Sequence, residues 1–319
     1  MPDTPPKILL DCDTGIDDAL TLLYLASLVR TGDADLVGVG TVHGNIDPGT
    51  GALNTLRVLE LAGVEGVPVA VGAGRPMAQD VHYALDWHGR DGLGDTDLPA
   101  PAGAPTGESA AAQIVRLARE HPGELSLLAI GPLTNLGAAL LLDGELPALV
   151  REVVIMGGAF DHPGNITTHA EANVWHDPEA ADLALSADWP VTLVPLDVTH
   201  PTAVGEQWLT RLAAHDSAVA RFASRILEFY VTAYTPVLKR RGAVVHDALA
   251  AMLVMDPEVC GYTERPVRVE RRGELTRGAT VWDARSIPAD DDRRPARVAT
   301  GVDVAAFQDR LLAALLSLD

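Results

Sequence analysis

Four carboxylates lie within eight positions near the start of the chain, at Asp11, Asp13, Asp17 and Asp18. Asp11 and Asp13 are two positions apart, so they leave a strand on the same face, and Gly15 allows the chain to turn tightly before a helix. Four negative charges this close repel one another unless a cation, a helix dipole or a proton offsets them. The spacing therefore predicts a metal site, an acid/base site or both. An all-oxygen cluster suits a hard cation such as calcium or magnesium.

Two further groups of polar side chains lie later in the chain. The loop at residues 164–173 carries Asn165, Glu171 and Asn173. Their amides and carboxylate offer the mixed donors and acceptors that a polyhydroxylated ligand such as a sugar requires. The pair His246-Asp247 opens a predicted helix, where an imidazole near its ordinary pKa can donate a proton at neutral pH. Taken separately, each of these groups also fits an ordinary loop or helix start.

Alternating strand and helix patterns surround these groups. The alternation predicts an α/β fold with a single domain over residues 1–319, an open and mostly parallel sheet flanked by helices, and mainly helical additions in the C-terminal third. Strands are expected at residues 7–11, 35–42, 67–71, 125–130, 152–156 and 191–196, with β-like segments at 267–270 and 280–282. Helices are expected at residues 16–30, 49–62, 108–120, from 133, and at 178–187, 219–234, 246–255 and 304–318.

The carboxyl ends of the strands are where ligands of such sheets bind. Several predicted strands are followed there by polar or glycine residues, and these positions should converge on one crevice. They are Asp11 and Asp13, Asn45, Gly131, Gly157-Gly158 and Asp197. The long polar stretch at residues 72–107 is expected to form a functional loop or lid.

The composition excludes several classes of protein. A formal net charge of −20 at pH 7 leaves no basic face for a phosphate backbone, so no nucleic-acid partner is expected. The two cysteines, Cys12 and Cys260, lie far apart in the sequence, which argues against a disulfide framework. Neither a secretory signal nor an apolar run of spanning length is visible. We therefore expect a cytoplasmic protein without a membrane partner.

The motifs occur in an order that resembles the inosine-uridine preferring nucleoside hydrolase family. They are DCDTGIDDA at 11–19, GN at 44–45, GPLTN at 131–135, MGG at 156–158, the loop at 164–173 and HD at 246–247. The resemblance implies a calcium-dependent N-ribohydrolase on a single α/β domain. It also implies a small-molecule nucleoside as substrate, and a homodimer or homotetramer.

The resemblance assigns a role to each motif residue. Calcium would be held by the side chains of Asp13, Asp18 and Asp247 and by the backbone carbonyl of Ile130. Asp13 would also be the catalytic general base. The substrate, chiefly its ribose hydroxyls, would contact Asp17, Asn45, Met156, Asn165, Glu171 and Asn173.

The nucleobase side of the site is less specific. His88, Tyr230 and Tyr234 resemble positions that line the nucleobase pocket in the family. Tyr230 and Tyr234 are four apart and share a helix face, a spacing that a core stripe also shows. His246 is the expected catalytic proton donor to the departing base. Because the purine-specific branch of the family typically lacks this histidine, the resemblance implies a broad, pyrimidine-preferring or inosine-preferring enzyme.

The chemistry of the residues agrees with this reaction. Breaking an N-glycosidic bond builds positive charge on the sugar ring, so the site needs carboxylates near the ring and a way to stabilise the departing base. A hard cation would position and acidify a water for Asp13 to deprotonate.

Two other functions remain open at this point. A phosphatase of the haloacid dehalogenase type also begins with a strand that ends in Asp-x-Asp, here Asp11 and Asp13, but it needs a lysine beside the phosphate. Only Lys7 and Lys239 are available. The second alternative is a non-catalytic, calcium-dependent nucleoside or ribose binding protein. The presence of both Asp13 and His246 favours catalysis over this alternative.

Overall fold

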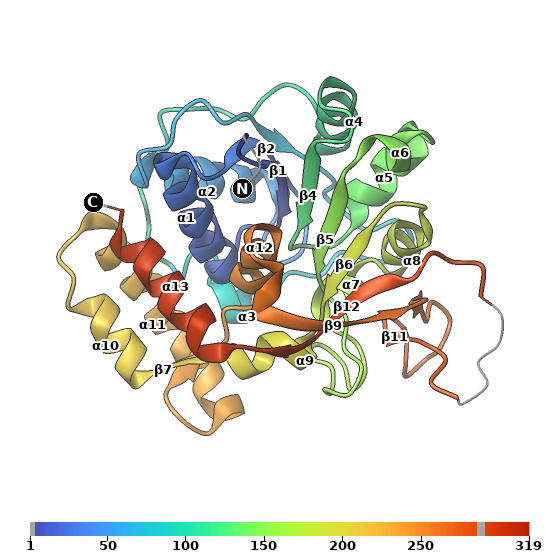
Figure 1. The fold of residues 1–319 in the computed structure, drawn as a ribbon. Helices are drawn as coiled ribbons and strands as arrows, with labels where there is room; N and C mark the ends of the chain where they lie inside the picture. Colours follow the sequence, from blue (N-terminus) through green and yellow to red (C-terminus); the bar gives the residue numbers. More distant parts are fainter. Residues whose placement is uncertain (1–3, 286–290, 319) are drawn as a thin grey trace.

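The chain folds around one long sheet, shown in Figure 1. A computed structural model describes residues 4–285 and 291–318. Within them, the strand order of this sheet is β3-β2-β1-β4-β5-β6-β12-β9. Its strands are β1 (Lys7–Cys12), β2 (Asp35–Thr41), β3 (Val69–Val71), β4 (Leu125–Ala129), β5 (Glu152–Met156), β6 (Val191–Val194), β9 (Cys260–Arg265) and β12 (Ala296–Val302). All neighbours are parallel except β12 and β9. The expected mostly parallel α/β sheet is confirmed.

Helices cover both faces of the sheet (Figure 1). One face packs against α1 (Ile16–Thr31), α2 (Pro48–Leu61), α11 (Ala218–Leu238), α12 (His246–Met255) and α13 (Val304–Leu316). The other face packs against α4 (Ala110–Glu120), α5 (Thr134–Leu142) and α8 (Pro178–Ser186). Because both faces are covered, β4 and β6 are buried along their whole length.

Shorter elements complete the chain. The short helices are α3 (Leu85–His88), α6 (Leu146–Leu149), α7 (Ala172–His176), α9 (Leu196–Thr199), α10 (Glu206–Ala213), η1 (His200–Thr202) and η2 (Pro257–Val259). Two small antiparallel pairs join β7 (Val204–Gly205) to β8 (Gly242–Ala243) and β10 (Arg268–Val269) to β11 (Thr280–Val281). None of the described helices is both long and apolar enough to cross a membrane.

The C-terminal third differs from the sequence prediction. The β-like segments expected at 267–270 and 280–282 form the separate β10-β11 pair, whereas the edge of the main sheet is built by β9 and β12, which the pattern analysis did not predict. β9 is an edge strand with several exposed, charged positions, so it lacks the continuous apolar pattern of a buried parallel strand. The expected helix at 219–234 extends to Leu238 and contains Pro236.

Candidate active site

A cavity of about 410 Å³ lies at the carboxyl ends of the sheet strands. Loops after β1, β2, β4 and β5 line it, together with parts of α3, α11 and α12. The predicted site residues on its wall are Asp13, Asp17, Asn45, His88, Ile130, Met156, Asn165, Glu171, Asn173, Tyr230, Tyr234, His246 and Asp247. Asp18 is fully buried behind this wall. Segments far apart in the sequence therefore meet at one site.

The turn from β1 into α1 holds the first carboxylates. Its left-handed residue is Thr14, with a φ of 30°, rather than the expected Gly15. Gly15 is needed for space, because a Cβ there would lie 2.4 Å from Nδ1 of His88 and 2.6 Å from Nδ2 of Asn45. Backbone N–H groups of Gly15 (2.8 Å) and Asp13 (3.2 Å) donate to the carboxylate of Asp18. The turn thus orients Asp18 with main-chain donors.

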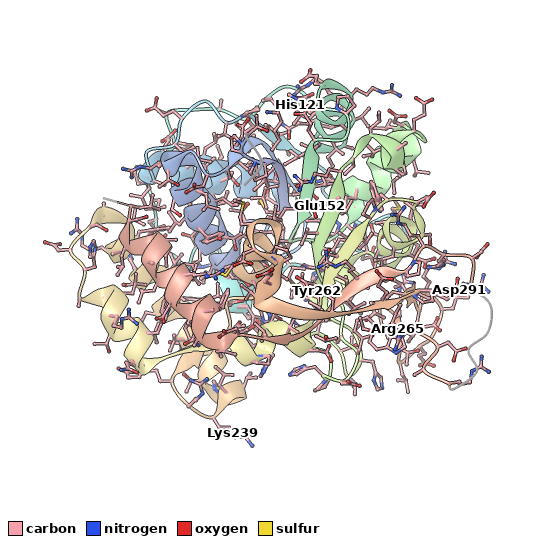
Figure 2. The ribbon with its side chains drawn as sticks, in the orientation of Figure 1. His121, Glu152, Lys239, Tyr262, Arg265 and Asp291 are labelled. Carbon is pink, nitrogen blue, oxygen red and sulfur yellow. The ribbon has the colours of Figure 1, made fainter. Side chains whose placement is uncertain are left out.

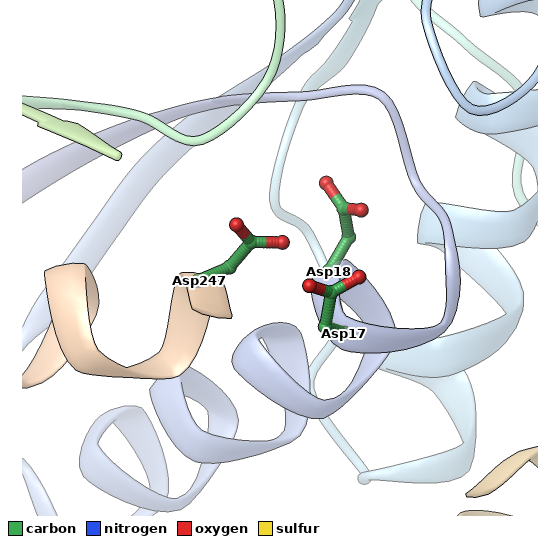
Figure 3. Close-up of side chains that lie close together, drawn as sticks. All are labelled: Asp17, Asp18 and Asp247. Atoms are coloured by element: carbon green, nitrogen blue, oxygen red, sulfur yellow. The ribbon is translucent and has the colours of Figure 1, made fainter. Parts of the chain in front are cut away.

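The carboxylates of Asp17, Asp18 and Asp247 face one another across the starts of α1 and α12, as Figure 3 shows. One oxygen from each lies within 4.8 Å of the others. Asp13 lies beside them, and its buried Oδ1 has no hydrogen-bond partner among the described residues. Ile130 lines the same cavity. Buried carboxylates with an orphaned oxygen form a donor set that fits a hard cation.

Burial raises the pKa of each carboxyl group in this cluster. The pKa of Asp17 rises to about 8, because burial and the neighbouring Asp18 both disfavour its charged form. Burial also raises the pKa values of Asp13, Asp18 and Asp247, and neighbouring carboxylates add to the increase at Asp13 and Asp247. Protons therefore compete with a cation for these oxygens.

Side-chain amides beside the carboxylates are oriented by hydrogen bonds. Asn173 Nδ2 donates to the carbonyls of Ile130 (2.9 Å) and Met156 (3.1 Å), and Asn45 Nδ2 donates to Asp18 Oδ2 (3.0 Å). Each amide is therefore left with its oxygen as an acceptor. The Asn165 side-chain amide has the opposite orientation. Its Oδ1 accepts from the N–H of Ala172 (2.9 Å), which leaves its NH₂ group as a donor.

Glu171 is both a helix cap and a cavity residue. Its carboxylate accepts the backbone N–H groups of Asn173 (2.8 Å), Val174 (3.1 Å) and Gly158 (3.0 Å). Burial raises its pKa to about 7, although these donors lower it. Three donors leave a carboxylate room for a further hydroxyl donor.

His246 lies between two hydroxyl groups. Its Nδ1 is 2.7 Å from Thr199 Oγ1, and its Nε2 is 2.8 Å from the hydroxyl of Tyr234. Burial lowers its pKa to about 3, with smaller effects of other histidines. The sequence analysis expected an imidazole near its ordinary pKa, and the structure places it instead in a dry site where the neutral form is favoured.

His88 reaches the same cavity from the long loop. The backbone N–H of Ile16 donates to its Nδ1 (3.0 Å), and its ring packs against Tyr230 with a centroid distance of 5.2 Å. Burial lowers its pKa to about 3. His88 is therefore a neutral imidazole with its proton on Nε2, where it is a hydrogen-bond donor.

Five residues of the expected crevice do not line the cavity: Asp11, Gly131, Gly157, Gly158 and Asp197. The Asp11 carboxylate accepts from Asn135 Nδ2 (2.7 Å), and burial raises its pKa to about 7. Asp197 accepts the backbone N–H groups of residues 160–162 and so anchors the loop that leads to Asn165. Gly131 packs against the backbone of Asp13, with no space for a side chain.

Pattern analysis missed several cavity residues. His162, His176 and His200 line the wall, and the rings of His162 and His200 lie 4.4 Å apart. Thr199 was missed as the partner of His246. These residues come from short helices and loops, where no periodic pattern distinguishes a cavity residue from a solvated one.

Known proteins resemble the chain over most of its length. The sequence profile of the inosine-uridine preferring nucleoside hydrolase family matches residues 8–309. An inosine-uridine preferring nucleoside hydrolase from Crithidia fasciculata is 36% identical, with 88% of this chain and 89% of that protein covered. A pyrimidine-specific ribonucleoside hydrolase from Shewanella woodyi is 34% identical, with 97% of each covered.

Solved structures show the same similarity. A plant nucleoside hydrolase superposes with a TM-score of 0.93 and 30% identity, covering 98% of this chain and 99% of that one. A purine-preferring ribonucleoside hydrolase from Gardnerella vaginalis gives 0.91 and 29%, covering 98% of both chains. The fold and its acidic cavity define an α/β enzyme that hydrolyses ribonucleosides. The chain belongs to the inosine-uridine preferring nucleoside hydrolase family.

The phosphatase alternative loses its support. Lys7 pairs with Asp35 at the amino end of β1 (3.4 Å), the end opposite the cavity. Figure 2 shows Lys239 just beyond the end of α11 with its side chain pointing outward. Neither lysine lines the cavity. Family membership likewise favours an enzyme over the non-catalytic binding protein.

Proposed function

We propose that the protein is a calcium-dependent nucleoside N-ribohydrolase that prefers pyrimidine nucleosides and inosine. The observation that carries the proposal is the buried, unpartnered Oδ1 of Asp13 beside the carboxylates of Asp17, Asp18 and Asp247. Asp13, Asp18, Asp247 and the Ile130 carbonyl would hold the ion. When bound, calcium supplies positive charge that orients the ribose diol and acidifies a water.

Different side chains of the cavity act on the sugar and on the base. Asp13 accepts a proton from the water whose oxygen attacks C1′ of the ribose. The C1′–N bond breaks, and its electron pair leaves with the base. Asp17, Asn45, Asn173 and Glu171 hold the hydroxyls through acceptor oxygens, whereas Asn165 donates. His246, which also lines the cavity, stabilises the departing base.

The preference for particular bases is proposed from the nucleobase side. His88 offers an N–H donor on Nε2, which matches a carbonyl oxygen of uracil or hypoxanthine. Tyr230, Tyr234 and Met156 supply the apolar surface. The names of the Crithidia and Shewanella relatives support the same preference. The structurally similar Gardnerella protein is named as purine-preferring, so activity on purine and pyrimidine nucleosides must be compared directly.

The test is release of free base and reducing sugar from inosine, adenosine, uridine and cytidine, with calcium present and phosphate absent. We expect release from uridine and inosine, and none after Asp13→Asn, because the amide cannot accept the proton. Asp35→Asn, which alters an exposed carboxylate at the other end of the sheet, is the matched control. Release by Asp13→Asn at the wild-type rate, or full activity after exhaustive chelation, would contradict the proposal.

We also infer a cytoplasmic homodimer or homotetramer that takes part in nucleoside salvage. Both cysteines, Cys12 and Cys260, are free and buried, as suits a reducing compartment. The strong negative charge disfavours nucleic acid as a partner. Leu141 and Leu142 at the end of α5 are 73% and 66% exposed, so contact between subunits would cover apolar surface. Light scattering coupled to size exclusion tests the assembly, and a monomer would contradict it.

A further inference from the structure

The loop between β3 and α4 turns back on itself around one carboxylate, that of Asp91. Each oxygen of this carboxylate accepts two backbone N–H groups. Oδ1 accepts from Leu93 and Asp95 (both 2.8 Å), and Oδ2 accepts from Thr96 (2.9 Å) and Asp97 (3.3 Å). Hydrogen bonds to a charged acceptor are strong, so four of them hold this part of the loop in one conformation.

The same part of the loop is held between two helices. Asn54 on α2 donates its Nδ2 to the carbonyl of Asp91 (2.7 Å). Gly94 packs on α11, where an added Cβ would lie 2.9 Å from Cβ of Phe229. The side chain of Leu93 is buried. The loop is therefore packed against the body of the protein on both sides of Asp91.

His88 precedes Asp91 by three positions and is tied to the same loop. Its carbonyl accepts the N–H of Gly94 (2.8 Å). Its side chain reaches the amino end of α1, where Nδ1 accepts the backbone N–H of Ile16 (3.0 Å). Because a backbone N–H can only donate, Nδ1 must carry a lone pair, and the ring proton is on Nε2. The ring lines the cavity, so this N–H is a donor for a bound ligand.

We infer that Asp91 is a positioning residue that fixes the loop and thereby holds His88 as a hydrogen-bond donor to the nucleobase. The inference rests on the proposed function for the identity of the ligand. Asp91 does not line the cavity, so it acts through His88 and not by touching the substrate. A donor that is held in place before the base departs does not have to be ordered during the reaction.

Asp91→Asn tests this role with almost no change in shape. An amide has a single acceptor oxygen, so whichever way it is turned, its NH₂ group faces two of the four backbone donors. Asp95 and Asp97 are exposed, so water can bond to N–H groups released there, and the core is not altered. The matched control is Asp95→Asn in the same loop. Asp95 accepts the N–H of Arg90 through Oδ1 (2.7 Å), and an amide oxygen can keep that bond.

The state of His88 is measured first, without substrate. Long-range proton–nitrogen NMR of the calcium-loaded chain with labelled histidine distinguishes a protonated ring nitrogen from one with a lone pair. The chain has 10 histidines, and His88→Ala assigns the signal. We expect the proton on Nε2 in the wild type and in Asp95→Asn, and a mixture of tautomers in Asp91→Asn. A wild-type proton on Nδ1, or an unchanged His88 signal in Asp91→Asn, would overturn the inference.

A double-mutant cycle then shows whether Asp91 acts through His88. In Asp91→Asn we expect kcat/KM for uridine and inosine to fall about tenfold, the effect of one weakened hydrogen bond. In a chain that already carries His88→Ala, the same substitution should lower kcat/KM less than about twofold, because the donor that it positions is gone. Asp95→Asn should leave kcat/KM unchanged in both backgrounds. A tenfold loss from Asp91→Asn in both backgrounds would contradict a role through His88.

A second substrate separates positioning from a general structural defect. A ribofuranoside of 4-nitrophenol offers no nucleobase carbonyl to His88, so Asp91→Asn should lower its kcat/KM less than about twofold. Equal losses on this substrate and on uridine would overturn the inference. If the wild type hydrolyses no nucleoside, the proposed function fails, and the NMR result still decides whether Asp91 positions His88.

Discussion

Individual residues of the site are governed by burial more than by their ordinary chemistry. Burial lowers the pKa of His246 and of His88 to about 3, so both imidazoles are neutral near neutral pH. It raises the pKa of Glu171 to about 7 and of Asp17 to about 8. The base side of the site therefore has neutral donors, and the sugar side has carboxyl acceptors whose charged form is disfavoured by burial. This division suits cleavage of the bond between base and sugar.

Replacing His246 with alanine should lower kcat most for substrates whose base is a poor leaving group. We expect kcat for inosine and uridine to fall at least about 100-fold, the usual scale of a lost acid or electrophilic group. A nucleoside analogue with an activated leaving group should lose only a few-fold. Steady-state kinetics on both substrates check this prediction. Equal losses on the two would show that His246 acts on folding or on sugar binding.

The site residues that could be identified from the sequence alone lie in dense motifs. Asp13, Asp17 and Asp18 occur together because one strand-to-helix turn must hold several carboxylates. This density of acidic residues can be recognised in the sequence. Thr199 on α9 contacts His246, and His162 in the loop after β5 lines the cavity, each as a single residue. Their contacts depend on long-range packing. No local pattern encodes them, and only the structure reveals them.

At the scale of elements, the turn from β2 into α2 is as constrained as that after β1. Gly44 has a φ of 154°, and a Cβ there would lie 2.1 Å from Oδ2 of Asp13. Asn45, the next residue, donates its backbone N–H to the same oxygen (2.7 Å). This turn therefore fixes the position of the proposed base.

Gly44→Ala should damage the site more than the fold. The methyl group would displace Asp13, so we expect loss of calcium binding and of activity, measured by titration calorimetry and base release. The matched control is Gly63→Ala at the end of α2, where φ is 70° and nothing lies within 4 Å of the added atom. It should cost about 1 kcal/mol of unfolding free energy and keep activity. Similar activity in the two variants would contradict the prediction.

The loop that follows β3 is anchored by hydrogen bonds to two other segments of the chain. The N–H of Met77 donates to Asp177 (2.9 Å), and Gln79 Nε2 donates to the carbonyls of Trp175 (2.9 Å) and His176 (3.1 Å). Arg277 donates to Gln79 Oε1 (2.9 Å). The sequence predicted a functional loop from its length and composition. Its anchors lie about a hundred and two hundred residues away in the chain, which no local pattern could indicate.

The sheet itself was predictable where the chain is buried on both faces. The alternation of apolar strands with helices predicted the parallel strands at the centre of the sheet, because such strands carry nearly continuous apolar runs. The antiparallel edge was not predictable, because most positions of β9 are exposed or half-exposed and two are charged; among the described residues this strand pairs with β12 alone. Edge pairing is decided by tertiary packing rather than by local propensity.

For the whole molecule, we expect calcium binding to be coupled to proton release. The cluster carboxyls have raised pKa values, with Asp17 at about 8, so the metal-free protein holds protons there below that pH. The ion must displace them, and affinity should therefore rise at least about tenfold between roughly pH 6 and pH 8. Calorimetry in two buffers of different ionisation enthalpy measures both Kd and the protons released. A Kd that does not change with pH would contradict the coupling.

Buried histidines should also make the stability of the fold sensitive to acid. The Thr134 hydroxyl donates to Asp177 (2.8 Å), so it accepts from Nε2 of His43 (2.9 Å). Nδ1 of His43 is buried, and no group in the described part of the chain bonds to it. Burial lowers the pKa of His43 from 6.5 to about 4. The unfolded chain therefore binds more protons between these values. This contribution to stability is present above pH 6.5 and is lost as the pH falls toward about 4.

His43→Phe tests this linkage through urea unfolding. For the wild type, His43 alone should cost about 2 kcal/mol of unfolding free energy between roughly pH 7 and pH 5. The variant should lose less stability over the same interval by about that amount. His169→Phe, at an exposed position, is the control and should keep the wild-type slope. A variant with an unchanged slope would show that His43 does not titrate as described.

The orientation of the cavity amides has a consequence for which metabolites the protein can use. Asn45 and Asn173 give their N–H groups to protein atoms and turn oxygen toward the ligand, beside several buried carboxylates. Such a wall receives hydroxyl groups, whereas a phosphoryl group would bring about two further negative charges against it. We therefore expect nucleoside 5′-phosphates to be poor substrates, so a nucleotide would have to lose its phosphate before its base is released.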